Sequence, residues 1–324
     1  YFLKFSSMLL LCTLNCLGFA ALALIAYRIL SAICNILYPY FMGTPVDLHK
    51  KAGAKWAVVT GATDGIGKAY ATQLARKKFN VLLVSRTQSK LEETKQKIEQ
   101  AAPKGIEVKT FAFDFSASTH DAYEPLIEEL RKIEIGFLVN NVGMSFEHPE
   151  VLHATEGGLQ RLADMTTINC LPVVLLSSVA LEQMSKRKAG IIINIASFAG
   201  YNPMSHWNVY SAAKRFVLHL SACLRAEYAE TGVTIQAIAP LLVATKMAKI
   251  SRASFFGPSA GAFVEQALGT VGLSDDTTGC FSHQMQMELM NLMPGFVRDA
   301  LLKKNTLTMR ARALKKRANE AKKQ

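Results

Sequence analysis

Short apolar runs alternate with longer amphipathic segments through most of the chain. Six runs are continuously apolar rather than alternating in polarity, as strands buried on both faces should be: 56–60, 81–85, 108–113, 135–139, 191–196 and 233–239. Segments with helical periodicity lie between them, among them 66–78, 89–100 and 208–230. The pattern predicts an α/β fold with a doubly wound parallel sheet and right-handed crossovers.

The first 44 residues have a different pattern. Residues 8–26 contain no charge, and as a helix they would extend over about 28 Å, close to the hydrocarbon thickness of a bilayer. A second apolar stretch, residues 29–42, follows and contains three aromatic residues suited to a membrane interface. We expect an uncleaved membrane anchor over residues 1–44. A signal peptide and a buried helix stay open as alternatives.

Basic residues are distributed unevenly around this segment. Only Lys4 precedes it, whereas Arg28, Lys50, Lys51 and Lys55 follow it. The positive-inside rule therefore predicts that the body faces the cytosol. The six cysteines show neither zinc spacing nor a disulfide framework, and no Asn-x-Ser/Thr acceptor occurs. Both facts fit a reducing compartment and a protein without a metal site.

Charge and composition narrow the class of protein. The 324 residues carry a formal charge of +12, and half of them are hydrophobic, which excludes disorder. Residues 303–324 hold nine basic residues and one acid, so this tail accounts for +8 of the charge. Nucleic acid is therefore not expected as a partner of the body. The tail could face anionic lipid or act as an address, and a solvated helix is the alternative.

A glycine-rich turn joins the first strand to a helix. It reads Thr60-Gly61-Ala62-Thr63-Asp64-Gly65-Ile66-Gly67. Glycines allow the backbone to approach a pyrophosphate, and a helix N-terminus stabilises its negative charge. The spacing differs from the commoner Gly-x-Gly-x-x-Gly. Its place between strand and helix nevertheless favours a dinucleotide site over an ordinary turn.

The ends of the next strands carry further candidates for the cofactor site. Arg86 stands where an NAD site would place an acid, and its planar cation suits a ribose 2′-phosphate. This favours NADPH and reduction, against a solvated loop arginine. Asp114 could accept from the adenine amine or cap a turn. Asn140, Asn141 and Gly143 could hold the sheet edge near the adenosine or form a purely structural turn.

Four polar residues form a candidate catalytic set. Tyr210 and Lys214 are spaced i, i+4 on one predicted helix face, so the ammonium would lower the tyrosine pKa from about 10. Ser197 follows the fifth strand and could polarise a carbonyl. Asn169 lies in a helical run close to Pro172, which suggests a local distortion, and could fix a water linking Lys214 to solvent. A tolerated helix asparagine is the alternative.

Together these motifs resemble the classical short-chain dehydrogenase/reductase family over residues 55–245. The resemblance implies that Tyr210 is the general acid, that Ser197 and Tyr210 contact the substrate, and that Asn169 and Lys214 complete a proton relay. It also implies a cofactor site made of Thr60, Gly61, Gly65, Ile66, Gly67, Arg86, Asp114, Asn141, Tyr210, Lys214 and Val243. One departure is Leu241 after Pro240, where many members have Pro-Gly.

Segments 58–68, 138–145 and 243–250, with the N-terminal apolar region, resemble one group more narrowly. This is the group of very-long-chain 3-oxoacyl-CoA reductases, also called 17β-hydroxysteroid dehydrogenase type 12. The resemblance implies NADPH-dependent reduction of 3-oxoacyl-CoA in fatty acid elongation at the endoplasmic reticulum membrane. Elongation enzymes, membrane lipid and a second copy in a homodimer would be its partners. A 17-ketosteroid reductase and an inactive nucleotide-binding scaffold are the alternatives.

The segment after Pro240 bears on the choice of substrate. Apolar residues alternate there with Lys246, Lys249 and Arg252. An acyl-CoA needs apolar cover for its chain and cations for its phosphates, whereas a steroid needs only the first. Solvated basic residues beside a membrane are the alternative. The expected organisation is a membrane anchor at 1–44, a catalytic domain at 50–302 and a basic tail at 303–324.

Overall fold

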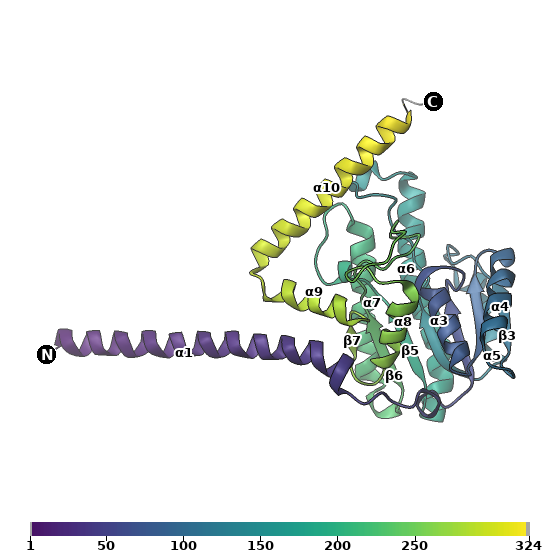
Figure 1. Cartoon of the computed structure of the whole chain (residues 1–324), viewed down its shortest axis with the longest axis horizontal. Coiled ribbons are helices and arrows are strands. Elements are labelled where there is room, and N and C mark those ends of the chain that lie inside the picture. Colours follow the sequence, from purple (N-terminus) through teal and green to yellow (C-terminus); the bar gives the residue numbers. More distant parts are fainter. Residues whose placement is uncertain (1, 322–324) are drawn as a thin grey trace.

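The structure is a computed structural model and describes residues 2–321. Its body is built around one seven-stranded parallel sheet in the order β3-β2-β1-β4-β5-β6-β7 (Figure 1). The strands are β1 Trp56–Thr60, β2 Asn80–Ser85, β3 Val108–Ala112, β4 Ile135–Asn140, β5 Ile191–Ile195, β6 Thr234–Ile238 and β7 Asp276–Thr277. The predicted doubly wound sheet is confirmed. β7 has two residues, too few for a recognisable apolar run.

Helices cover both faces of the sheet. Adjacent residues of β1 point in opposite directions: Val59 belongs to the apolar cluster on one face of the sheet, and Val58 to the cluster on the other face. Both are fully buried, which explains the continuous apolar runs. The helices of the body are α2 Leu48–Ala52, α3 Gly65–Arg76, α4 Gln88–Ala101, α5 His120–Arg131, α6 Gly158–Arg187, α7 Asn208–Glu227 and α8 Ala260–Gly269.

Two helices differ from the sequence-based expectation. α6 continues through Pro172 as one helix, so the local distortion expected beside Asn169 does not interrupt it. α7 begins at Asn208 as predicted but ends at Glu227, three residues early. A short 3₁₀ turn, Ala229–Thr231, and Gly232 with φ +73° follow it. A left-handed residue cannot continue an α-helix, and glycine adopts that conformation without a Cβ clash.

The N-terminal helix α1, Phe2–Leu37, extends away from the body (Figure 1). It continues into a π-helical turn at Tyr38–Met42. Residues 11–42 are long and apolar enough to cross a membrane and are almost wholly exposed on the protein. Within residues 2–321, α6 is the one other helix that meets this criterion, but 44% of its apolar window is buried in the body. α1 is therefore compatible with the predicted anchor, and α6 is a core helix.

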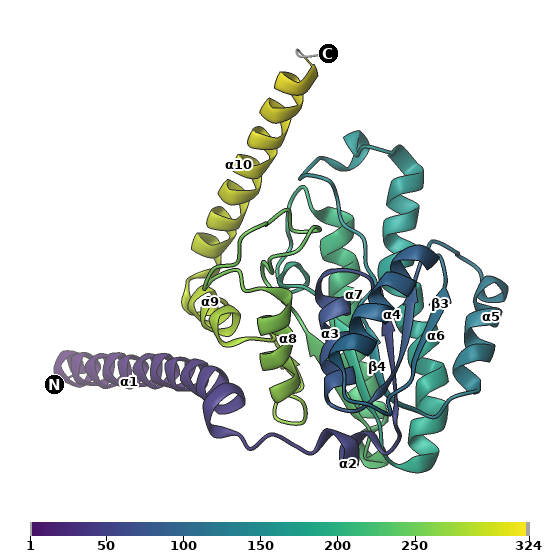
Figure 2. The same ribbon diagram turned by 45° about the vertical axis from the view of Figure 1, so that its right-hand side comes forward.

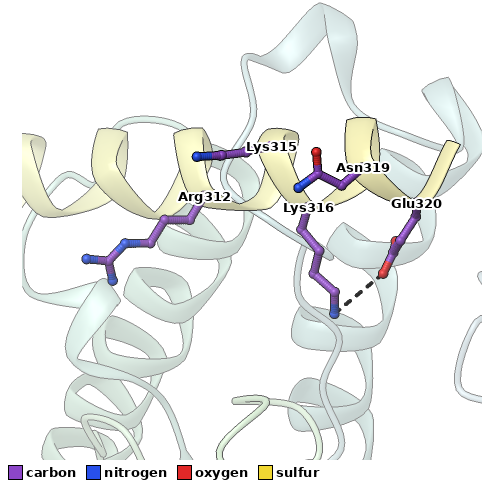
Figure 3. A pocket seen from close by; sticks show the side chains of 5 residues that line it. All are labelled: Arg312, Lys315, Lys316, Asn319 and Glu320. Carbon is purple, nitrogen blue, oxygen red and sulfur yellow. Dashed lines mark ion pairs between the residues drawn. The ribbon is translucent and has the colours of Figure 1, made fainter. Parts of the chain in front are cut away.

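The C-terminal region forms two helices, α9 Phe281–Leu292 and α10 Gly295–Ala321. α10 is a single helix that contains both residue 302 and residue 303 (Figure 2). The boundary between catalytic domain and basic tail that the sequence suggested there stays a prediction. Its C-terminal turns carry Arg312, Lys315 and Lys316, and Lys316 pairs with Glu320 at 3.8 Å (Figure 3). The dilysine at 322–323 lies outside the described residues.

Candidate active site

The end of β1 is joined to the end of β4 by Thr60. Its buried hydroxyl donates to the carbonyl oxygen of Val139 at 3.3 Å. The same oxygen accepts the backbone N–H groups of Asn141 at 2.9 Å and Val142 at 3.0 Å. These bonds satisfy backbone N–H groups that follow the strand and would otherwise be partly buried without partners. Thr60 thereby fixes the floor of the glycine-rich turn.

The glycines of this turn are required by close approach as well as by conformation. Gly61 has φ +63°, and Gly65 has φ +53°. A Cβ on Gly67 would lie 2.3 Å from the Asn141 Nδ2 and 2.4 Å from the Gly61 carbonyl oxygen. Asp64 caps α3, because its Oδ1 accepts from the Gly65 N–H at 2.8 Å. The result is a tight turn that ends at a helix N-terminus, a geometry that fits a pyrophosphate.

Three predicted cofactor residues lie around this turn in different ways. Arg86 is exposed directly after β2, next to Ser85, whose hydroxyl lies 3.0 Å from that of Thr63 in the turn. The Asn141 Nδ2 donates to the Thr60 carbonyl at 2.9 Å, so this side chain also holds the turn together. Asp114 is exposed and accepts the Ser116 N–H at 3.0 Å, the turn-capping alternative. Their contacts with a cofactor stay predictions.

The remaining cofactor candidates also lie at this end of the sheet. Ile66 is half-buried in the first turn of α3 and packs against the apolar cluster beneath it. Val243 follows β6 and is buried in the same cluster. The methyl group of Thr245, two residues later, lies 3.2 Å from the position of a Cβ on Gly65. The segment after β6 therefore contacts the glycine-rich turn.

The structure brings Ser197 and Tyr210 together. Ser197 follows β5 and caps a short 3₁₀ turn, Phe198–Gly200, by accepting the Ala199 N–H at 3.2 Å. Tyr210 lies in the first turn of α7, and its hydroxyl is close enough to the Ser197 side chain for that group to lower the pKa of Tyr210 in part. The two hydroxyls converge although thirteen positions separate them in the sequence. They can hold one carbonyl oxygen from two directions.

Lys214 is buried behind this pair. Its Nζ donates to the Ile195 carbonyl at 3.0 Å and lies 5.8 Å from the ring centroid of Tyr210. Burial lowers the pKa of Lys214 to about 8. Burial also raises the pKa of Tyr210, and the nearby Ser197 side chain offsets this only in part. The expectation that Lys214 lowers the pKa of Tyr210 was therefore wrong for this structure, because desolvation of the phenolate dominates.

Asn169 meets Lys214 at Gly143. The Asn169 Nδ2 donates to the carbonyl oxygens of Met144 and Met165, each at 2.8 Å. A Cβ on Gly143 would lie 2.9 Å from the Asn169 Oδ1 and 3.3 Å from the Lys214 Nζ. This buried Oδ1 has no hydrogen-bond partner among residues 2–321, and such an acceptor normally has a donor. The position suits the predicted proton relay, which stays a prediction.

Two positioning residues were missed by the sequence reading. Asn194 is fully buried within β5; it accepts from the Asn140 Nδ2 at 2.9 Å and donates to the Ser221 hydroxyl at 2.9 Å. It thus links β4 and β5 to α7, the helix of Tyr210. Its signal was a lone amide in an otherwise isoleucine-rich strand, residues 191–195.

The second is His283 on α9. The Leu241 N–H donates to its Nδ1 at 3.3 Å, and its Nε2 lies 3.2 Å from the Leu242 carbonyl oxygen. Burial lowers the pKa of His283, so the ring is neutral near pH 7. Leu241, which stands where many members of the family have glycine, is therefore held by His283. No local sequence signal connects positions 241 and 283.

Two of the three basic residues expected to bind substrate phosphates form ion pairs with acidic side chains. Lys249 pairs with Glu147 at 3.0 Å, and Lys246 pairs with Asp64 at 3.4 Å. These pairs are exposed, so their net contribution to stability is small. The Lys249 pair joins the segment after β6 to the segment before α6. Arg252 is exposed.

The comparisons with known proteins agree with this geometry. Residues 55–254 match the model of the short chain dehydrogenase family. The chain belongs to this family. It is therefore an oxidoreductase that acts on a carbonyl or hydroxyl group and uses a nicotinamide cofactor.

Its relatives include proteins of two stated activities. A very-long-chain 3-oxoacyl-CoA reductase of Caenorhabditis elegans is 56% identical over 313 residues, which cover 97% of this chain and 99% of the relative. A Caenorhabditis elegans protein whose name suggests a steroid dehydrogenase is 49% identical over 94% of this chain and 96% of its own length. Among solved structures, a metagenomic short-chain oxidoreductase in complex with NADP has 32% identity and a TM-score of 0.52, covering 57% of this chain and 81% of that one.

Proposed function

We propose that this protein reduces very-long-chain 3-oxoacyl-CoA to 3-hydroxyacyl-CoA with NADPH, as a step of fatty acid elongation. The observation that carries the proposal is the 56% identity to a reductase of that name over nearly the whole of both chains. The geometry of Ser197, Tyr210 and Lys214 supports it, because these residues can hold a ketone oxygen and deliver a proton to it.

The chemistry follows from the positions of these side chains. Ser197 and Tyr210 orient the C3 carbonyl oxygen and stabilise the negative charge that develops on it. When bound at the glycine-rich turn, a nicotinamide cofactor would supply the hydride for C3. Tyr210 holds its proton at neutral pH, because burial raises its pKa, and gives that proton to the oxygen. The Lys214 Nζ, 5.8 Å from the centroid of the Tyr210 ring, can then restore the proton of Tyr210 through Asn169 and solvent.

The preference for NADPH over NADH is assigned to Arg86. This exposed arginine follows Ser85 at the end of β2, where an NAD site would have an acid. We expect Arg86→Asp to weaken the binding of NADPH by about 1.5–3 kcal/mol, the range of a charged hydrogen bond. The same change should improve the use of NADH. The measurement is kcat/KM with each cofactor. Lys104→Asp, an exposed lysine beyond the far end of α4, is the matched control. An unchanged cofactor ratio in Arg86→Asp would refute the assignment.

The acyl-CoA substrate is supported by the character of residues 241–257. Leu242, Phe255 and Phe256 are more than half exposed there, and in the sequence they flank the basic residues Lys246, Lys249 and Arg252. The deciding experiment supplies purified full-length protein in detergent with NADPH and either 3-oxoacyl-CoA or estrone. Efficient reduction of the acyl-CoA supports the proposal. Turnover of estrone alone would favour a 17-ketosteroid reductase; the name of the 49% identical relative suggests a steroid dehydrogenase.

A triple alanine variant of Lys246, Lys249 and Arg252 tests the phosphate contact. It should raise KM for 3-oxoacyl-CoA and leave estrone kinetics nearly unchanged, because a steroid carries no phosphate. Equal losses on both substrates would mean that the segment had been deformed.

We also propose that the protein lies in the endoplasmic reticulum membrane, anchored by α1, with the body in the cytosol. The basic residues that follow residues 8–26 support this orientation.

A further inference from the structure

The end of the N-terminal helix lies along α9 in the antiparallel sense. Three contacts follow one another in order: the rings of Phe41 and Phe281 meet edge to face at 5.1 Å, the Asn35 Nδ2 donates to Glu288 at 3.1 Å, and the Arg28 guanidinium donates to the Asn291 carbonyl. Both views show α9 beside the last turns of α1 (Figures 1 and 2). The anchor is therefore docked on the body rather than tethered to it.

These contacts also indicate where the hydrocarbon layer would end. Glu288 is buried and accepts from Gln284 at 2.9 Å as well as from Asn35, a polar network that belongs outside hydrocarbon. Arg28 is the first charge after the uncharged residues 8–26, and charged side chains mark the membrane–water boundary. If α1 crosses a bilayer, the level of Arg28 and Asn291 is its surface.

The corner between α9 and α10 lies at that same level. Asn291 is followed at once by the end of α9, and α10 begins at Gly295. Large apolar side chains are exposed here: Leu289 at 54%, Leu292 at 38% and Phe296 at 79%. Lys303 and Lys304 are exposed on the following turns of α10. Apolar tips with lysines behind them match an interfacial element, whose cations reach lipid phosphates.

We infer that the α9–α10 corner is a second membrane contact, seated in the headgroup boundary of the bilayer that α1 crosses. The occupant is lipid because the contact between Arg28 and Asn291 sets this corner beside the expected bilayer surface. Two separated contacts prevent rotation of the body about the anchor axis, and so they fix which face of the reductase meets the membrane. This inference rests on the proposed anchor.

The test uses full-length protein in nanodiscs of phosphatidylcholine and phosphatidylserine. Phe296→Trp reports on the corner, and Leu17→Trp, at a 67% exposed position of α1, reports on the anchor. Leu159→Trp is the matched control: it is 86% exposed at the start of α6, close to the far end of α10, where Arg317 pairs with Glu156. Trp56 and Trp207 give a constant background that the parent protein measures.

Lipids brominated near the headgroup should quench most of the added emission at position 296 and little at position 159. Lipids brominated deep in the chains should quench position 17. Quenching at 17 without quenching at 296 would overturn the second contact and leave the anchor standing. A blue-shifted but unquenched probe at 296 would show a protein, such as a second copy, covering the corner. No quenching at either 17 or 296 would refute the anchor itself together with this inference.

Discussion

At the scale of single residues, burial controls the chemistry of the site. Tyr210 and Lys214 are both shifted toward their neutral forms because each loses water in the fold. A neutral phenol is the form that a reductase needs, since it has a proton to give. The intrinsic i, i+4 spacing brings the two side chains onto one face of α7, but the surrounding structure sets their protonation.

The first prediction concerns this proton. Tyr210→Phe keeps the ring and removes the hydroxyl, so reduction should slow by about 10²- to 10⁴-fold, the usual contribution of general acid–base catalysis. Single-turnover assays with NADPH and 3-oxoacyl-CoA measure the loss. Binding of NADPH should be retained, because the glycine-rich turn is untouched. Near-normal turnover would contradict the role of Tyr210.

The second prediction concerns the buried ammonium. The pKa of Lys214 is lowered from 10.5 to about 8 in the fold, so the unfolded chain binds this proton more tightly. Below about pH 8 both states are protonated and the fold bears the full desolvation cost, on the order of 3 kcal/mol. Between pH 8 and 10.5 the folded state releases this proton while the unfolded state keeps it. The desolvation cost therefore disappears, and the free energy of unfolding rises with pH.

Lys214→Met should therefore be more stable than the parent protein, and the difference should be largest near neutral pH. The loss of the hydrogen bond to Ile195 reduces this difference by about 1 kcal/mol. The gain should vanish as the pH approaches 10.5. Urea unfolding of both proteins near neutral pH and near pH 10 measures the difference. A difference in unfolding free energy that does not change with pH would show that Lys214 is not desolvated.

At the scale of elements, α10 supports the segment that precedes α6. The Arg310 guanidinium bonds the nearly buried Glu150 at 2.6 Å and 2.8 Å. Burial raises the pKa of Glu150, but hydrogen bonds from the Val151 N–H and Arg310 outweigh it and leave the pKa below its ordinary value. The Glu150 N–H donates to the His206 carbonyl at 3.0 Å, just before α7 begins. The C-terminal helix is thus linked to the start of the catalytic helix.

The third prediction follows from this link. Arg310→Ala leaves the nearly buried carboxylate of Glu150 without its cation. The free energy of unfolding should fall by about 1–3 kcal/mol. The environment of Trp207 should change too, since its ring meets Phe146 of the same segment at 6.1 Å. Urea unfolding and tryptophan emission measure these effects. Arg312→Ala, on an exposed position of the same helix, should change neither. Equal effects of both variants would mean that general charge, and not the pair with Glu150, matters.

At the scale of the whole molecule, two of the helices within residues 2–321 have the apolar length to cross a bilayer, but they have different surroundings. α1 is almost wholly exposed over its apolar window, and α6 is 44% buried over its own. Leu176 and Met184 of α6 are completely covered by the body. Moving α6 into lipid would uncover the sheet beneath it and lose that packing.

The fourth prediction is that α1 alone, of these two helices, contacts lipid chains. A photoactivatable hydrophobic probe dissolved in native membranes should label peptides from residues 11–27 and leave peptides from α6 unlabelled. Mass spectrometry after proteolysis gives the distribution. Strong label on α6 in the folded, active protein would contradict the arrangement of the body described here.

Features set by local order were predictable from the sequence. Strands such as 191–195 are recognisable because burial on both faces requires continuous apolar residues, and the turn at 60–67 because its glycines permit tight backbone. The spacing of Tyr210 and Lys214 follows from helix geometry alone. These features depend on neighbours a few positions away, so the fold class, the nucleotide turn and the shared helix face of Tyr210 and Lys214 could be predicted.

Contacts between distant segments were decided only by the tertiary structure. Asn169 reaches Lys214 at Gly143 because α6, α7 and the end of β4 converge there. His283 holds Leu241 from forty-two positions away, and Arg28 meets Asn291 across most of the chain. The pKa of Tyr210 depends on how much water the whole fold removes, not on its neighbour in the helix. Periodicity specifies which face of an element is buried, but desolvation and docking depend on what covers that face.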